Sequence, residues 1–162
     1  MRSLLICLSF LLIFPIIASA AESYLEKETQ LNISAQRTAD WIKSHGDAIR
    51  EASGLDVLED MGKGKFKVKR DSPKGTFIWI IQETTEKKKD GSYVFKSTLV
   101  KSIQGGIESS KSEIIVKDFR GRTNILIKSS AVVNNPKVKS PQMRIDMNVN
   151  LNRVRSLLEE AR

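Results

Sequence analysis

The sequence predicts an α+β fold, in which a curved antiparallel sheet of about seven strands wraps around a long C-terminal helix. Three observations predict it. Apolar residues within 140–162 recur at the helical period, most of 55–133 alternates with a period of two, and two short helical segments follow the first predicted strand. A helix with one apolar side needs a broad apolar partner, and the sheet supplies one.

The chain begins with a segment typical of a signal peptide, residues 1–20. Residues 4–17 are almost wholly apolar, and Ala18-Ser19-Ala20 is the small-x-small pattern that signal peptidase accepts. We therefore expect cleavage near Ala20 and a single secreted or periplasmic domain over 21–162. The alternative is an uncleaved anchor, because an apolar segment of this length is near the lower limit for crossing a bilayer.

The first half of the predicted domain contains one strand and two short helices. Residues 23–33 alternate loosely and carry no breaker, which favours a strand. Ser34 resembles an N-cap for a helix over 35–44, and Gly46 is expected to end that helix. Residues 47–53 then predict a second short helix, which Gly54 ends.

Six further strands are predicted from the period of two and from the turn residues between the runs. Asp90-Gly91 is the strongest hairpin signal, and all the connections are short, so strands that follow one another should be antiparallel neighbours. The predicted strands are 55–60, 65–70, 76–85, 92–103, a segment within 107–119, and 122–133.

The strand over 76–85 is apolar on both faces, which is typical of a central strand that is covered on both sides. This pattern leaves open which face points inward, that of Trp79 and Ile81 or that of Ile78 and Ile80.

The last segment predicts one long helix. Ser140 is expected to cap it, with Pro141 as its first residue, a position where the missing proline N–H costs nothing. One stripe at the helical period is expected to face the sheet, and it consists of Met143, Met147, Leu151, Val154, Leu158 and Ala161.

This order of elements resembles the helix-grip fold of the START-like superfamily, also called the polyketide cyclase/dehydrase and lipid-transport superfamily or SRPBCC. The resemblance covers nearly all of 21–162. Its matching stretches are Ile33-Ser34-Ala35 leading to Trp41-Ile42, Gly62-x-Gly64 before a strand, residues 119–123, and the helix ending in Leu157-Leu158. The resemblance implies a pocket between the long helix and the sheet.

The sequence lacks the common catalytic and metal-binding motifs. Its single histidine, His45, lies beside a glycine at a predicted helix end, where a capping role is expected, and its single cysteine, Cys7, lies in the leader. We therefore predict no catalytic residue, no metal and no cofactor.

Apolar residues that could line the implied pocket occur on several elements. The alternative for each is ordinary core packing, although methionines suit an adaptable pocket. The candidate ligand-binding residues are Trp41, Trp79, Ile81, Tyr93, Phe95, Ile125, Ile127, Met143 and Met147.

These features favour an exported, non-enzymatic, monomeric protein that binds a hydrophobic or amphipathic, lipid-like small molecule. The chain also has 27 Lys and Arg against 19 Asp and Glu, a net charge of +8. One alternative is therefore an envelope-associated interaction protein that docks on an anionic membrane through a basic face containing Lys65, Lys67 and Lys69. Nucleic acid is not expected, because no aromatic residues interleave with the lysines.

A further alternative is an enzyme of the cyclase or hydrolase type. It would require a carboxylate or tyrosine deep in the pocket, near an arginine and without a structural partner.

Overall fold

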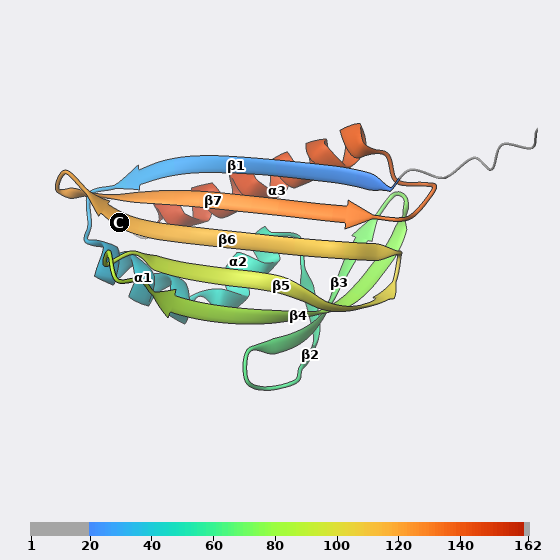
Figure 1. Ribbon diagram of the computed structural model, residues 1–162, viewed down its shortest axis with the longest axis horizontal. Helices are drawn as coiled ribbons and strands as arrows, with labels where there is room; N and C mark the ends of the chain where they lie inside the picture. Colours follow the sequence, from blue (N-terminus) through green and yellow to red (C-terminus); the bar gives the residue numbers. More distant parts are fainter. Residues whose placement is uncertain (1–19, 161–162) are drawn as a thin grey trace, which may run out of the picture.

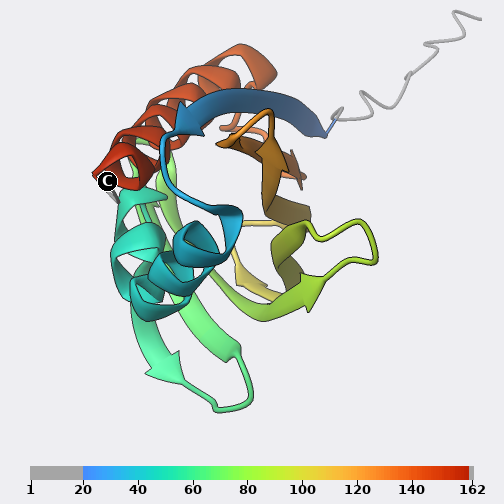
Figure 2. The ribbon, with the colours of Figure 1, turned by 90° about the vertical axis from the view of Figure 1, so that its left-hand side faces the viewer.

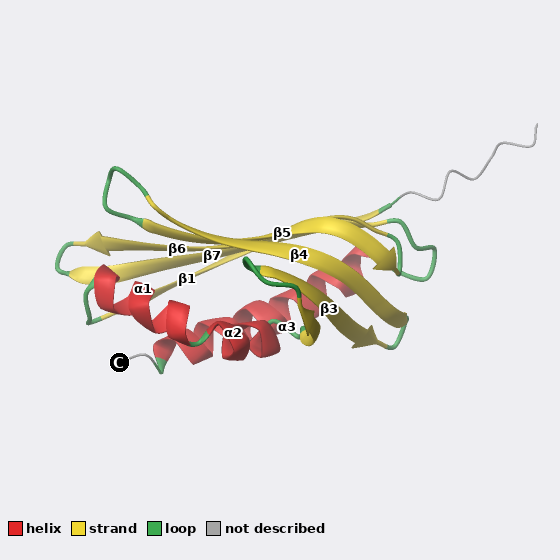
Figure 3. Cartoon of the chain, turned by 90° about the horizontal axis from the view of Figure 1, so that it is seen from below, coloured by secondary structure: helices red, strands yellow, loops and turns green. Residues whose placement is uncertain are grey.

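The structure is a computed structural model and describes residues 20–160. Seven antiparallel strands form one sheet in the order β1-β7-β6-β5-β4-β3-β2. The sheet is curved, and all three helices lie against its concave side (Figures 1, 2 and 3). The elements are β1 Ala21–Leu31, α1 Ala35–Ser44, α2 Gly46–Ala52, β2 Asp56–Asp60, β3 Lys65–Ser72, β4 Gly75–Lys87, β5 Tyr93–Gln104, β6 Ile107–Phe119, β7 Arg122–Val133 and α3 Ser140–Glu159. The predicted α+β fold is confirmed, and residues 1–19 of the predicted leader lie outside the described residues.

The first helix has the predicted bounds and the predicted N-cap. Ser34 has extended backbone angles, and its Oγ accepts a hydrogen bond of 3.3 Å from the Arg37 N–H. The prediction for Gly46 is wrong, because Gly46 is the first residue of α2 and His45 is the residue between the two helices. The break between the helices is one residue long. His45 leaves the helical conformation, although its N–H still donates to carbonyls of α1.

The C-terminal helix buries the predicted stripe. Its fully buried side chains are Met147, Leu151, Val154 and Leu158; Met143 is half-buried, and Ala161 lies outside the described residues. The predicted cap is wrong, because Lys139 occupies the N-cap position and Ser140 is the first helical residue. The Ser140 Oγ instead accepts a hydrogen bond of 3.0 Å from the Glu22 N–H, which ties the start of α3 to β1.

The orientation of the central strand β4 is resolved by burial. Phe77, Trp79 and Ile81 are 8%, 4% and 2% exposed, whereas Ile78 and Ile80 on the other face are only half-buried. Trp79 and Ile81 therefore face the concave side.

The ladder between β5 and β6 covers only part of both strands. It joins Tyr93–Thr98 to Lys111–Val116 and stops there. Beyond this point β5 continues to pair with β4 as far as Gln104, and the first residues of β6 pair with β7. The two strands thus separate before they meet again at the Gly105-Gly106 turn.

Candidate functional site

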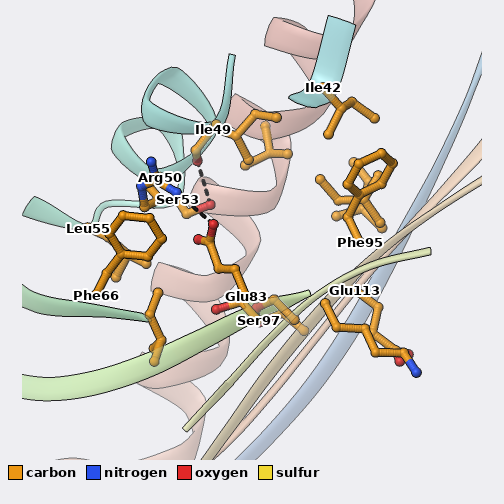
Figure 4. Close-up of a pocket in the computed structure, with 18 of the residues that line it drawn as sticks. Ile42, Ile49, Arg50, Ser53, Leu55, Phe66, Glu83, Phe95, Ser97 and Glu113 are labelled. Carbon is orange, nitrogen blue, oxygen red and sulfur yellow. Dashed lines mark hydrogen bonds and ion pairs between the residues drawn. The ribbon is translucent and has the colours of Figure 1, made fainter. Parts of the chain in front are cut away.

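A cavity of about 510 Å³ lies between the sheet, α2 and α3. Its apolar walls come from three sources, and Figure 4 shows several of these side chains around the open space. From the helices come Ile42, Ile49, Met147, Leu151 and Val154, from the edge hairpin Leu55 and Phe66, and from the concave face of the sheet Trp79, Ile81, Phe95, Ile114, Ile127 and Ala131. A volume of this size falls in the range of small-molecule sites.

The structure brings five of the nine predicted binding residues to this cavity. They are Trp79, Ile81, Phe95, Ile127 and Met147. Their role in binding stays a prediction, but all five line the same cavity.

The other four predicted residues lie elsewhere. Trp41 stacks on the exposed His45 ring, with centroids 4.1 Å apart, and Tyr93 is buried and donates its hydroxyl hydrogen bond to Gln36 Oε1. Ile125 is fully buried in the core under α1 and α3, and Met143 packs against a second cluster around Val68. None of these four is among the residues that line the cavity.

Polar side chains also form a row across the sheet wall of the cavity, and the sequence patterns did not predict this row. Glu83 on β4 pairs in register with Ser97 on β5, Ser97 with Ser112 on β6, and Ser112 with Ser129 on β7. All four line the cavity, and we refer to Glu83, Ser97, Ser112 and Ser129 as the polar row. The signal in the sequence is positional, because each serine lies two residues from a wall residue and so shares its face.

Apolar residues run alongside the polar row. Phe95, Ile114 and Ile127 also pair in register across β5, β6 and β7, one step along the strands. On the other side of the row, Ala131 lies across from Ser110, and both line the cavity. The cavity therefore has a polar belt with an apolar wall beside it.

An arginine from α2 reaches the end of the polar row. Arg50 Nη1 donates a hydrogen bond of 2.6 Å to Glu83 Oε2, and Nη2 donates to Asp47 Oδ1. The guanidinium also lies 4.1 Å from the centroid of the Phe66 ring. The Arg50 side chain is 10% exposed and that of Glu83 is 30% exposed, so this pair is largely shielded from solvent.

Burial and ion pairing have opposite effects on the pKa values of Arg50 and Glu83. Burial alone would lower the pKa of Arg50, but its bonds to Asp47 and Glu83 outweigh this effect and raise it. Burial raises the pKa of Glu83, and the attraction of Arg50 offsets only part of that rise. Arg50 is therefore a fixed cation, and Glu83 is the group that holds it against the sheet.

The glycine motif before β3 holds the backbone of Glu83. Gly62, Lys63 and Gly64 all have positive φ angles, and the Glu83 N–H donates to the Gly64 carbonyl at 2.7 Å. A Cβ on Gly64 would lie 2.7 Å from the Glu83 carbonyl oxygen, which is closer than such contacts occur. The motif thus permits a close approach of the turn to β4 beside the cavity.

A second arginine, Arg70, also lines the cavity. Arg70 on β3 donates from Nη2 to the Ser53 carbonyl at 2.6 Å and from Nε to the Gly54 carbonyl at 3.2 Å, which ties β3 to the segment directly after α2. Burial lowers the pKa of Arg70, and the nearby Asp146 partly opposes this.

Two buried donors in the cavity lining have no partner. Trp79 is 4% exposed and Arg50 is 8% exposed, and neither the Trp79 Nε1–H nor the Arg50 Nε–H meets an acceptor. Both nitrogens have almost no accessible surface, so they lie behind the cavity wall rather than on it.

The carboxylates that line the cavity have structural partners. Arg50 binds Glu83 and Asp47, and Lys111 Nζ lies 3.2 Å from Glu113. Within residues 20–160 no group of three or more His, Cys, Asp and Glu side chains could hold a metal ion. In the same range, no helix is both long enough and apolar enough to cross a membrane.

The lysines of β3 face acidic residues of the neighbouring edge strand. Asp56 pairs in register with Lys69 and Glu59 with Lys67, and Lys69 Nζ lies 2.6 Å from Asp71 and 3.6 Å from Asp56. Part of the expected basic face is thus neutralised locally.

No protein-family model matches the sequence, and no curated protein matches it. Solved structures do match its fold. A START superfamily protein from Mycobacterium smegmatis is 12% identical, with a TM-score of 0.59 over 85% of this chain and 94% of the other. A STAR-related lipid transfer protein from Xanthomonas axonopodis is also 12% identical, with a TM-score of 0.58 over 83% and 85%.

An aromatase/cyclase, Zhui, from a Streptomyces species shares the fold as well. It is 13% identical, with a TM-score of 0.52 over 86% of this chain and 93% of the other. The chain therefore has the helix-grip fold of START-like proteins, as its sequence predicted. Two of those proteins are named for lipid transfer and for aromatase/cyclase activity, and their likeness to this chain is one of fold.

Proposed function

We propose that the protein binds one hydrophobic or amphipathic, lipid-like molecule in the cavity between α3 and the sheet, and releases it unchanged. The observation that carries this proposal is the cavity of about 510 Å³, lined by apolar side chains from both the helices and the sheet. Filling such a space with an apolar ligand removes that surface from water, and each buried methylene contributes about 0.8 kcal/mol.

Two features support binding without chemistry. Of the carboxylates that line the cavity, Glu83 and Asp47 are held by Arg50, and Glu113 lies 3.2 Å from Lys111 Nζ. The histidine is not part of the lining and is stacked on Trp41. The fold itself is shared with a lipid transfer protein, which supports a lipid-like ligand.

We propose further that the protein acts outside the cytoplasm as a monomer. The leader pattern over 1–20 supports export, with the domain beginning at Ala21. Intact-mass measurement of protein purified from its host decides this point, because cleavage removes the first 20 residues and an uncleaved anchor leaves the full mass.

The ligand proposal is tested by filling the cavity. Ala131 lines it, so Ala131→Phe places a ring in the space, and we expect loss of binding of the neutral fluorescent probe N-phenyl-1-naphthylamine. The matched control is Ser130→Phe at the next position, which lies outside the cavity lining and should bind as wild type.

Overpacking costs about 1–3 kcal/mol, so both variants are first checked by thermal unfolding. Extraction of the purified protein into organic solvent, followed by mass spectrometry, then identifies any ligand retained from the host. Equal probe binding by wild type and a folded Ala131→Phe variant contradicts the proposal.

A further inference from the structure

The polar row restricts the chemistry of the ligand. This inference rests on the proposed function, because it concerns what occupies the same cavity. A cavity for a plain hydrocarbon chain would have apolar side chains at all inward positions of the sheet. Here three strands in succession place a serine at the same level, and the row ends at Glu83.

The serines have more hydrogen-bond donors than the acceptors that they find within the row. Ser112 Oγ and Ser129 Oγ lie 3.1 Å apart, so one hydroxyl donates to the other. Two hydroxyls carry two donor hydrogens, and their mutual bond uses only one. The remaining O–H needs an acceptor when water is displaced.

The spacing of the row sets the spacing of the groups that it can bind. Neighbouring strands lie about 4.8 Å apart, so Ser97 and Ser129, which are separated by one strand, lie about 10 Å apart at the backbone. A ligand with two or more oxygen atoms roughly 5 Å apart, the spacing of neighbouring strands, can therefore bind neighbouring hydroxyls of the row. The apolar row of Phe95, Ile114 and Ile127 beside it accommodates an apolar part of the same molecule.

The charges around the cavity favour a neutral ligand. Arg50 is already bonded to two carboxylates, those of Glu83 and Asp47, and Arg70 donates to two backbone carbonyls. These four side chains carry a formal net charge of zero. The other charged residues of the lining also have neighbours of opposite charge, because Lys43 lies near Asp40 and Lys96 pairs in register with Glu113. An added carboxylate or phosphate at the row would lie near Glu83 in a shielded site, where repulsion between like charges is strong.

We propose that the ligand is a neutral, oxygenated amphipathic molecule, whose hydroxyl, ester or ketone oxygens lie along the row Ser97–Ser112–Ser129 and whose hydrocarbon part packs on the apolar wall beside it. Monoacylglycerols are simple members of this chemical class. Fatty acids and unsubstituted hydrocarbons are not members of it.

The test compares three probes with chains of the same length: 1-monoolein, oleate and 1-octadecene. Each is measured by displacement of N-phenyl-1-naphthylamine from the full delipidated protein. We expect 1-monoolein to bind at least about tenfold more tightly than either of the others, since two additional neutral hydrogen bonds are together worth about that factor.

Serine-to-alanine variants then assign the preference to the row. The double change Ser112→Ala with Ser129→Ala should weaken 1-monoolein binding by about fivefold to tenfold and leave 1-octadecene binding unchanged. The control is Ser109→Ala with Ser130→Ala, on the same two strands but outside the cavity lining, which should change neither affinity. Thermal unfolding confirms that both variants are folded, and Ser112→Thr, which retains a hydroxyl, provides a second folded variant that should keep the preference.

The outcomes separate this inference from the proposed function. Equal binding of the three probes, or an unchanged 1-monoolein affinity in the folded double variant, overturns the polar-row inference and leaves the lipid-like ligand in place. Tightest binding of oleate also overturns it and points to Arg70 as a free cation. If wild-type protein binds neither the fluorescent probe nor any of the three compounds, the proposed function itself fails.

Discussion

Arg50 on α2 and Glu83 on β4 are joined by a hydrogen bond of 2.6 Å between Nη1 and Oε2, which ties a helix to the sheet at the edge of the cavity. The two residues are 33 positions apart in the chain. Their contact holds α2 over the cavity, together with the bonds of Arg70 to the carbonyls of Ser53 and Gly54, which directly follow that helix.

A double-mutant cycle measures this contact. Arg50→Met should destabilise the wild-type protein more than it destabilises the Glu83→Gln variant, because only the former leaves a shielded carboxylate without its cation. The coupling energy from urea unfolding should be about 0.5–3 kcal/mol, a range that applies to residues in one bonded network. Additive effects would show that the pair contributes nothing to stability.

The grip of α3 on the sheet depends on its buried stripe. Leu151 is 5% exposed, so Leu151→Ala should leave a void and lower the free energy of unfolding by about 2–5 kcal/mol. Arg153→Ala, on the exposed side of the same helix, should change it by about 0.5 kcal/mol or less. Equal urea midpoints for the two variants would contradict the observed packing of α3.

The turn before β3 requires glycine at one position. Gly64→Ala combines a φ of +72° with a Cβ that would lie 2.7 Å from the Glu83 carbonyl oxygen, so we expect a clear loss of stability, of about 1–3 kcal/mol. Gly62→Ala is the matched control, because it has a similar φ of +76° and no atom within 4 Å of the added Cβ. The difference between the two melting temperatures isolates the close approach from the backbone strain.

The β4–β5 turn should contribute to the decrease in the free energy of unfolding at low pH. Hydrogen bonds from the Ser92 side chain and then its backbone N–H lower the pKa of Asp90 below its ordinary value of 3.8, with a smaller effect of Lys117. A carboxylate whose pKa is lowered by folding stabilises the protein above its unfolded pKa, and this stability is lost as the pH falls through the folded pKa.

Asp90→Asn keeps an acceptor for the turn but removes this titration. Urea midpoints between about pH 6 and pH 2 should therefore fall less steeply for the variant than for wild type. Glu108→Gln, at an exposed position on β6, serves as the control for loss of a surface carboxylate. A parallel decline of wild type and Asp90→Asn would exclude the contribution of the turn.

The fold could be predicted from the sequence because its elements have clear periods and short connections. The helix over 35–44, the stripe of α3 and the six strands after α2 were all encoded in local pattern. The wrong predictions concern helix ends, where a residue has more than one possible partner and the sequence pattern does not show which one it binds. Ser140 has the chemistry of a cap, but its hydroxyl binds the Glu22 N–H, a partner from a distant strand.

The cavity could be predicted only in part. Apolar type identified Trp79, Ile81, Phe95, Ile127 and Met147, but it could not separate them from Ile125 or Met143, which have the same character and pack elsewhere. The polar row depends on the pairing registers of three hairpins. The alternation within any single strand does not show which residues of neighbouring strands pair.

The early end of the β5–β6 ladder has a consequence for backbone protection. Amides of Tyr93–Thr98 lie in a strand that is bonded on both sides, whereas the part of β5 from Leu99 onward is bonded to β4 alone. Releasing that outer part breaks one ladder, so its opening requires less free energy than global unfolding. Amide hydrogens there should exchange with solvent deuterium by local fluctuation, at rates independent of the stability of the core around α3.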